Sequence, residues 1–229
     1  MSLVIAIKDK DRIVLGADKQ VSAGDSRSHT STKIWQVQEL PGAIMGSVGS
    51  ARASQIIQYI PVIDKNLLGN DNNINTEFVI CSLAPTIAAG LKANGVVVEA
   101  ANDATCELMP NAFIFAYKDN AWMIWNDMSV TELTDYLAIG SGSDIARGVL
   151  YATEDKNPFE RIVTSIDAAA EATLFVDHGI DLLVTKNRDT DEKQAAKALG
   201  YDLETLTENI EQQLDVKDKT SKKKTKNKK

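Results

Sequence analysis

The chain opens with MSLVIAIKDKDRIVLGADKQ (residues 1–20), and this stretch decides the fold. Residues 3–7 and 13–17 are apolar and rich in β-branched side chains, which predicts two strands. The polar DKD segment at 9–11 predicts a tight turn, so the two strands are expected to form a hairpin. A sheet that begins this early leaves Ser2 at its edge.

The rest of the chain continues with paired strands and paired helices. Pro85 falls inside the second helix and is expected to kink it, and residues 21–32 are expected to form a loop. Because the strands come in hairpins, the order argues against a parallel sheet and favours an α+β fold: a four-layer α/β/β/α sandwich, with two antiparallel sheets between helix layers. Strands are expected at 34–38, 43–45, 112–117, 121–125, 136–139 and 180–185, and helices at 50–60, 76–93, 145–153 and 158–176.

Composition predicts an ordinary globular protein with a charged tail. The chain has 229 residues, of which 44% are hydrophobic, and it contains neither a signal peptide nor an uninterrupted apolar run of about 18 residues. The expected units are a domain at 1–189, a helical extension at 190–216 and a disordered Lys-rich tail at 217–229. The tail carries +7 and leaves −14 on the remainder, so nucleic acid is an improbable partner. We expect a cytoplasmic protein that does not contact membranes.

Several kinds of active site are excluded by the residues available. The two histidines, His29 and His178, are not accompanied by a G-x-S-x-G motif, so a Ser-His-Asp hydrolase is not expected. No zinc-ligand spacing or phosphate-binding G-x-x-x-x-G-K-[ST] motif occurs, and Cys81 and Cys106 are expected to be free thiols. We therefore expect neither a metal nor an organic cofactor.

Ser2 is the sharper candidate for chemistry. A serine hydroxyl needs a base, and an N-terminal serine carries its own in the α-amine, with a reference pKa of about 7.7–8.0. Ser2 gains that amine only when Met1 is removed. Ser2 alone is weak support, because serine is a common second residue. The glycine turns at 46–49 and 140–142, each between a strand and a helix, are also weak alone, although such turns can bind an oxyanion.

The ordered set of motifs resembles the proteasome β-subunit family, and its bacterial relative HslV in particular. The motifs are SLVIAI at 2–7 followed by RIVLGADKQ at 12–20, TKIWQV at 32–37, GAIMGSVGSA at 42–51, and YLAIGSGS at 136–143. The resemblance extends from Ser2 to about Lys186. It implies the N-terminal nucleophile hydrolase fold, which is the sandwich expected above, and a ring that encloses a proteolytic chamber.

The resemblance also implies roles for five residues. Ser2 takes the place of the N-terminal nucleophile, which is usually threonine. Asp18 matches the acid that orients the catalytic lysine, and Lys33 matches that lysine if one residue is deleted before it. Gly46 matches the glycine whose N–H forms the oxyanion hole, and Ser141 matches a serine that holds the terminal amine. Taken singly, a strand-end acid, a loop lysine and a helix-capping serine are commoner interpretations of Asp18, Lys33 and Ser141.

One part of the family pattern is missing. A D-x-x-S pair that supports the nucleophile in many relatives corresponds here to Thr173 and Val176. Valine cannot form the hydrogen bond, so either Asp177 substitutes or the site is weakened.

Three functions therefore stay open. The first is a homo-oligomeric, proteasome-like endopeptidase that cuts peptides or unfolded proteins, arranged in stacked rings and supplied by a separate ATP-dependent unfoldase. The second is a ring or scaffold subunit without activity, and the third is an amidase for small molecules. The extension at 190–216 either packs on a neighbouring subunit or decorates its own.

Overall fold

The structure is a computed structural model, in which two units are distinguished, Met1–Asn187 and Arg188–Lys229. The expected disordered tail, the second half of the extension, Met1, His29 and Cys106 all lie outside the described residues. These described residues are 2–23, 26–28, 32–64, 66, 74–96, 99–100, 107–186 and 191–200.

The predicted N-terminal hairpin forms the centre of a four-stranded antiparallel sheet. Strands β1 (Leu3–Asp9) and β2 (Arg12–Asp18) pair with each other, and their neighbours are β12 (Tyr136–Gly140) and β13 (Ile180–Val184), in the order β12-β1-β2-β13. All seven residues of β2 are buried. The chain's first residues are therefore central to the sheet.

The second sheet has five antiparallel strands. Their order is β11-β10-β9-β6-β5, so β6 lies between the hairpin partner β5 on one side and β9 on the other. The strands are β5 (Ile34–Gln36), β6 (Ile44–Gly49), β9 (Asn111–Tyr117), β10 (Asn120–Ile124) and β11 (Val130–Glu132).

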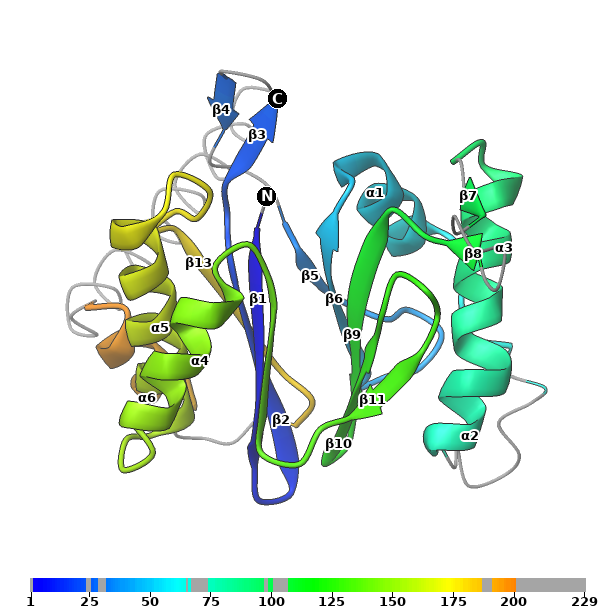
Figure 1. The fold of residues 1–229 in the computed structure, drawn as a ribbon. Helices are drawn as coiled ribbons and strands as arrows, with labels where there is room; N and C mark the ends of the chain where they lie inside the picture. The colour runs from blue at the N-terminus through cyan, green and yellow to red at the C-terminus, as the bar shows by residue number, and fades with distance from the viewer. Residues whose placement is uncertain are drawn as a thin grey trace, which may run out of the picture. The chain divides into compact units, whose positions relative to one another are not determined.

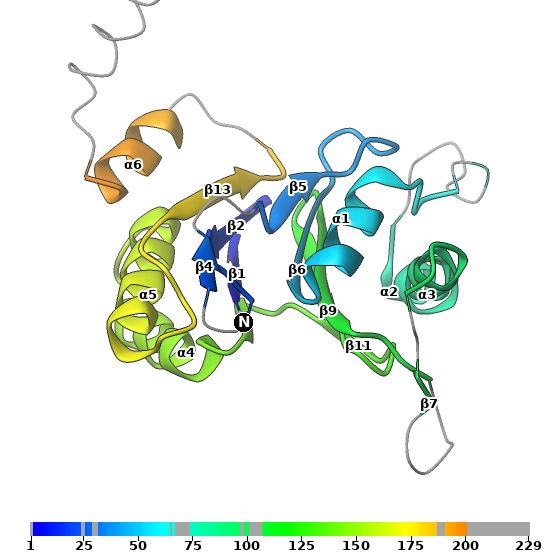
Figure 2. The ribbon, with the colours of Figure 1, turned by 90° about the horizontal axis from the view of Figure 1, so that it is seen from above.

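Helices cover the outer face of each sheet. Helices α4 (Ser143–Ala152) and α5 (Pro158–Ala172) pack on the four-stranded sheet, while α1 (Ala51–Tyr59) and α3 (Ala84–Ala93) lie on the other side, against the five-stranded sheet (Figures 1 and 2). One apolar core fills the space between the sheets, and a second lies between the five-stranded sheet and its helices. The predicted α+β fold with four α/β/β/α layers is confirmed.

The segment predicted as one kinked helix is a helix with a π-helical turn. It consists of α2 (Thr76–Phe78), the π-helix Val79–Leu83 and α3, and the N–H of Ala84 donates to the carbonyl of Val79, five residues earlier. The wide turn immediately precedes Pro85, which has no N–H to donate. By length and mean hydropathy (1.2) Thr76–Ala93 could cross a membrane, but it packs in the core with Val79, Leu83 and Leu91 fully buried.

Several short elements differ from the sequence prediction. Part of the expected loop at 21–32 is a small hairpin of β3 (Val21–Ala23) and β4 (Ser26–Ser28), too short to show a periodic pattern. Helix α5 ends at Ala172, four residues before the expected end, because Thr173 is extended. The remaining elements are β7 (Glu99–Ala100) with β8 (Glu107–Leu108), and α6 (Asp191–Ala198) in the second unit.

Candidate active site

Asp18 and Lys33 form a buried ion pair at the end of β2. The Lys33 Nζ lies 2.6 Å from Asp18 Oδ1, and the two side chains are 6% and 0% exposed. The same Oδ1 accepts the N–H of Leu3 at 2.7 Å, and Oδ2 accepts the N–H of Gln20 at 3.1 Å. The carboxylate therefore connects the catalytic-lysine candidate to the first strand.

The electrostatics of Lys33 are a balance between burial and counter-charge. Burial lowers the pKa of Lys33 from the ordinary lysine value, and the adjacent Asp18 carboxylate opposes this shift, with smaller contributions from Asp177 and Asp181. Lys33 thus holds its proton less tightly than a surface lysine, which suits a group that assists proton transfer.

The turn after β12 fixes the backbone of Ser2. The N–H of Ser141 donates to the Ser2 carbonyl at 2.9 Å, and the Ser2 nitrogen, a peptide nitrogen here because Met1 precedes it, donates to Ser141 Oγ at 3.3 Å. Gly140 has φ +107°, and a Cβ there would lie 2.0 Å from the Ser2 carbonyl oxygen. Only glycine permits this close approach.

Ser2 and Lys33 open onto a common cleft of about 690 Å³. One wall comes from the segment after β2 and from the β3–β4 hairpin, and the other comes from the end of β6 and from α1, so the start of β1 lies between them (Figure 1). The remaining lining residues are Gln20, Val21, Ser22, Ser28, Thr32, Ser47, Gly49, Ala51, Ser54, Gln55, Gln58 and Tyr59.

Of the five predicted site residues, Asp18 and Ser141 reach the cleft through their bonds to Lys33 and Ser2, whereas Gly46 is not among its lining residues. The N–H of Ser47 points towards β5 and donates to the Lys33 carbonyl at 2.9 Å. Alternation along the strand directs the N–H of Gly46 the opposite way, towards β9, where Gly46 is opposite Ile114. Gly49, three residues further along, does line the cleft, so its N–H is a second candidate for the oxyanion donor beside that of Gly46.

The missing D-x-x-S pair has an apolar replacement. Val176 is 4% exposed, and a Cβ on Gly142 would lie 2.9 Å from its side chain, so Val176 packs against the glycine turn that holds Ser2. Thr173 forms the extended end of α5, and its Oγ1 accepts the N–H of Phe175 at 3.4 Å. Val176 therefore supports this side of the site by packing.

Gln20 is a site residue that sequence reasoning missed. It is 2% exposed, and its Nε2 donates to the Leu174 carbonyl at 2.8 Å and to Ser22 Oγ at 2.9 Å. These bonds tie the segment after Asp18 to the loop after α5. No sequence pattern marks this role. Gln20 is distinguished only by its burial, two residues after the buried Asp18, and a polar stretch of sequence does not show which of its side chains are buried.

A second polar cluster supports the cleft wall at the start of α1. Ser47 Oγ lies 2.5 Å from Ser54 Oγ, and Asn111, which is 1% exposed, bonds to Ser54 and to both backbone groups of Ser50, the N-cap of the helix. The wall is therefore held by a satisfied network. Among the residues described, no three His, Cys, Asp or Glu side chains are arranged to hold a metal ion.

The known proteins found to be similar to this chain are solved structures. Neither the family models nor the curated proteins searched match the chain. Thiobacillus denitrificans BPH in complex with epoxomicin is similar, with TM-score 0.61 and 19% identity over 80% of this chain and 97% of that chain. HslV from Trypanosoma brucei gives TM-score 0.57 and 16% identity, covering 80% and 98% of the two chains.

A third similar structure matches more of the chain. The Anbu (Gly-1) mutant from Hyphomicrobium sp. strain MC1 gives TM-score 0.59 and 15% identity, with 94% of this chain and 97% of that chain covered. Each of these structures shares less than 20% sequence identity with the chain, so the similarity shows the fold alone. The chain has the N-terminal nucleophile hydrolase fold of the HslV-like, proteasome-like proteins.

Proposed function

We propose that the chain is a proteasome-like endopeptidase whose nucleophile is the hydroxyl of Ser2 after removal of Met1. The observation that carries this proposal is the buried Asp18–Lys33 pair, which opens onto the same cleft as Ser2. A buried ion pair is a costly way to stabilise a fold, and its position beside a hydroxyl-bearing N-terminus favours a chemical role.

The first half-reaction forms an acyl-enzyme. The α-amine of Ser2 takes the proton from Oγ as Oγ attacks the carbonyl carbon of a peptide. The Lys33 ammonium lowers the proton affinity of that amine by like-charge repulsion and stabilises the developing alkoxide. Asp18 holds Lys33 in place, and Ser141 holds the amine through the bond its Oγ makes with the Ser2 nitrogen.

Collapse of the tetrahedral intermediate completes the step. The negative charge on the former carbonyl oxygen is stabilised by a backbone N–H of β6, for which Gly46 and Gly49 are the two candidates. The α-ammonium of Ser2 then gives its proton to the leaving amine, leaving an ester on Ser2. Water hydrolyses this ester with the same amine as base, releasing the carboxylic acid and the free Ser2 hydroxyl.

Three measurements test the proposal. Intact-mass spectrometry should show the loss of Met1, and the processed protein should cleave fluorogenic peptides. Ser2→Ala should abolish this turnover while leaving circular dichroism and thermal unfolding unchanged. Epoxomicin, which is present in the BPH structure, should add its mass to processed wild type and not to Ser2→Ala. Quantitative retention of Met1, or full turnover by Ser2→Ala, would refute the proposal.

The proposed assembly and surroundings follow from the same similarity. We infer a homo-oligomeric ring acting on peptides and unfolded proteins in the cytoplasm, supplied by a separate ATP-dependent unfoldase, and requiring neither a metal nor an organic cofactor. Size-exclusion chromatography with light scattering tests the ring, because the monomer mass is 24.9 kDa. A panel of small amides tests the alternative substrate class.

The second candidate is a binding or scaffold subunit without chemistry. The buried Val176 favours it, because an apolar side chain packs where a hydrogen-bonding group supports the nucleophile in the resembled family. The outcome that distinguishes it is a processed Ser2 that neither turns over peptides nor reacts with epoxomicin.

A further inference from the structure

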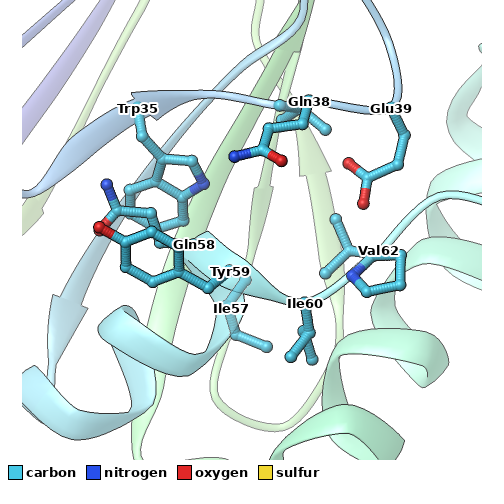
Figure 3. A pocket seen from close by; sticks show the side chains of 10 residues that line it. Trp35, Gln38, Glu39, Ile57, Gln58, Tyr59, Ile60 and Val62 are labelled. Atoms are coloured by element: carbon cyan, nitrogen blue, oxygen red, sulfur yellow. The ribbon is translucent and has the colours of Figure 1, made fainter.

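A second hollow continues the cleft at the far end of α1. It has a volume of about 270 Å³ and shares two lining residues, Gln58 and Tyr59, with the cleft that contains Ser2. Figure 3 shows Trp35, Gln58 and Tyr59 towards one end and Glu39 and Val62 towards the other. The two hollows therefore adjoin at the C-terminal end of the helix, on either side of Gln58 and Tyr59.

The length of α1 sets the spacing between them. Ala51, Ser54, Gln55 and Gln58 line the cleft with helical spacing, which places them along one face. From Ala51 to Tyr59 the helix rises about 12 Å at 1.5 Å per residue. An extended peptide covers that distance in about four residues, at roughly 3.3 Å each.

The chemistry of the hollow favours a long basic side chain. Its wall combines apolar residues such as Trp35, Ile60 and Val62 with the polar Gln38 and Gln58. The Glu39 carboxylate at its rim has no hydrogen-bond or ion-pair partner among the described residues. The methylenes of lysine or arginine can lie on such a wall while the cation meets a carboxylate. A neutral apolar side chain would leave Glu39 unpaired.

We propose that this hollow binds a lysine or arginine of the substrate peptide, about four residues from the bond that is cut. The inference rests on the proposed peptidase function and deepens it by naming a substrate feature. Tyr59, which is 76% exposed, forms the ridge between the two hollows, and Glu39 supplies the charge. Glu39 lines the second hollow and not the cleft that contains Ser2, so we expect cleavage of short peptides to be independent of it.

The test compares substrates that differ in one residue. A short fluorogenic peptide is extended by four residues, on one side or the other of the cleaved bond. The added segment ends in lysine or in norleucine, which keeps the four side-chain carbons of lysine and lacks its ammonium group. We expect the lysine peptide of one series to exceed its norleucine partner by about threefold to fivefold in kcat/KM, as for a partly exposed ion pair. Glu39→Gln should remove this preference without changing cleavage of the short peptide, and Tyr59→Ala, which also alters the wall of the cleft, should reduce kcat/KM more for both extended peptides than for the short one.

Matched surface variants control for unspecific effects. Tyr151→Ala removes an aromatic side chain that is 71% exposed on α4, and Glu154→Gln neutralises an exposed acid in the turn after that helix. Both should leave all substrates unchanged. Equal effects of Tyr59→Ala and Tyr151→Ala, an unchanged lysine preference in Glu39→Gln, or an altered oligomeric state in either variant of the hollow would overturn the inference, since the last outcome would identify the hollow as a subunit interface.

A binding measurement separates this inference from the function on which it rests. If processed wild type cleaves no peptide, the proposed function fails by itself. The inference is then tested with Ser2→Ala and a fluorescein-labelled ten-residue peptide containing lysine, followed by fluorescence anisotropy. Tighter binding of the lysine than of the norleucine peptide, lost in Glu39→Gln, would support the hollow as a peptide site, and identical affinities would refute it.

Discussion

Replacing Asp18 by asparagine should leave a buried cation without its counter-charge. Asparagine keeps the volume, but its single side-chain oxygen can accept from only one of the Leu3 and Gln20 N–H groups, and it loses the negative charge 2.6 Å from Lys33 Nζ. Removing one partner of a buried ion pair costs about 3–5 kcal/mol. For a chain of this size each kcal/mol lowers Tm by about 2–4 °C, so we expect a decrease of about 6–20 °C at pH 7.

Deprotonation of Lys33 sets an upper limit on that cost. A lysine whose pKa has the ordinary value of 10.5 in the unfolded chain can be neutralised at pH 7 for about 4.8 kcal/mol, and at pH 9.5 for about 1.4 kcal/mol. Because burial lowers the pKa of Lys33 in the folded protein, the variant binds fewer protons folded than unfolded. Its free energy of unfolding therefore rises with pH up to about 10.5, and the penalty relative to wild type should shrink.

Chemical denaturation of four proteins at pH 7 and pH 9.5 measures this stability penalty and its pH dependence. They are wild type, Asp18→Asn, Lys33→Met and the double variant, which form a double-mutant cycle. Adding Lys33→Met to Asp18→Asn should raise the free energy of unfolding by at least about 2 kcal/mol at pH 7, since it removes the unpaired cation. The reasoning is refuted if Asp18→Asn costs less than about 1 kcal/mol at pH 7, if the penalty is independent of pH, or if the second substitution restores nothing.

Three further substitutions test the supports of the site. Gly140→Ala should lower the free energy of unfolding by about 1–3 kcal/mol or more, because φ is +107° and the Cβ would meet the Ser2 carbonyl. Urea unfolding measures this loss, and an unchanged free energy of unfolding would contradict the close approach. Asn111→Ala should cost about 1–3 kcal/mol by leaving buried partners of its amide unpaired, with the Ser47→Ala variant as the milder comparison. Val176→Ser should cost about 1–3 kcal/mol by removing buried methyl groups, and a gain of stability would indicate that the new hydroxyl finds a partner near Ser2.

The sheets could be predicted from the sequence because their signals are local. The hairpin of β1 and β2 follows from β-branched runs around a polar turn, and the order of hairpins and helix pairs predicts the layers. The pairing of Asp18 with Lys33 could not be derived from those patterns, since it depends on which ends of two different sheets meet. It came from the resemblance, and the structure places the two side chains 2.6 Å apart.

The choice between Gly46 and Gly49 as oxyanion donor depends on strand register. Moving one residue along a strand reverses the direction of the backbone N–H, so Gly46 and Ser47 point to different neighbouring strands. A glycine motif identifies the turn but does not specify which of its N–H groups points to the cleft. Register, which fixes this direction, depends on long-range pairing that a single sequence does not display.

The hydrogen bonds of Asp18 explain why the nucleophile candidate lies at the terminus of a central strand. One oxygen of Asp18 binds both the Leu3 N–H and Lys33 Nζ, so it fixes the residue after Ser2 and the lysine in the same geometry. The turn at Ser141 then fixes Ser2 from the opposite side. The β1–β2 hairpin therefore carries Ser2 and Asp18, and Lys33 completes the site from the residue before β5 of the other sheet. A flexible N-terminus could supply the same amine and hydroxyl. Fixing their orientation would then cost conformational entropy, which the sheet has already paid in the folded protein.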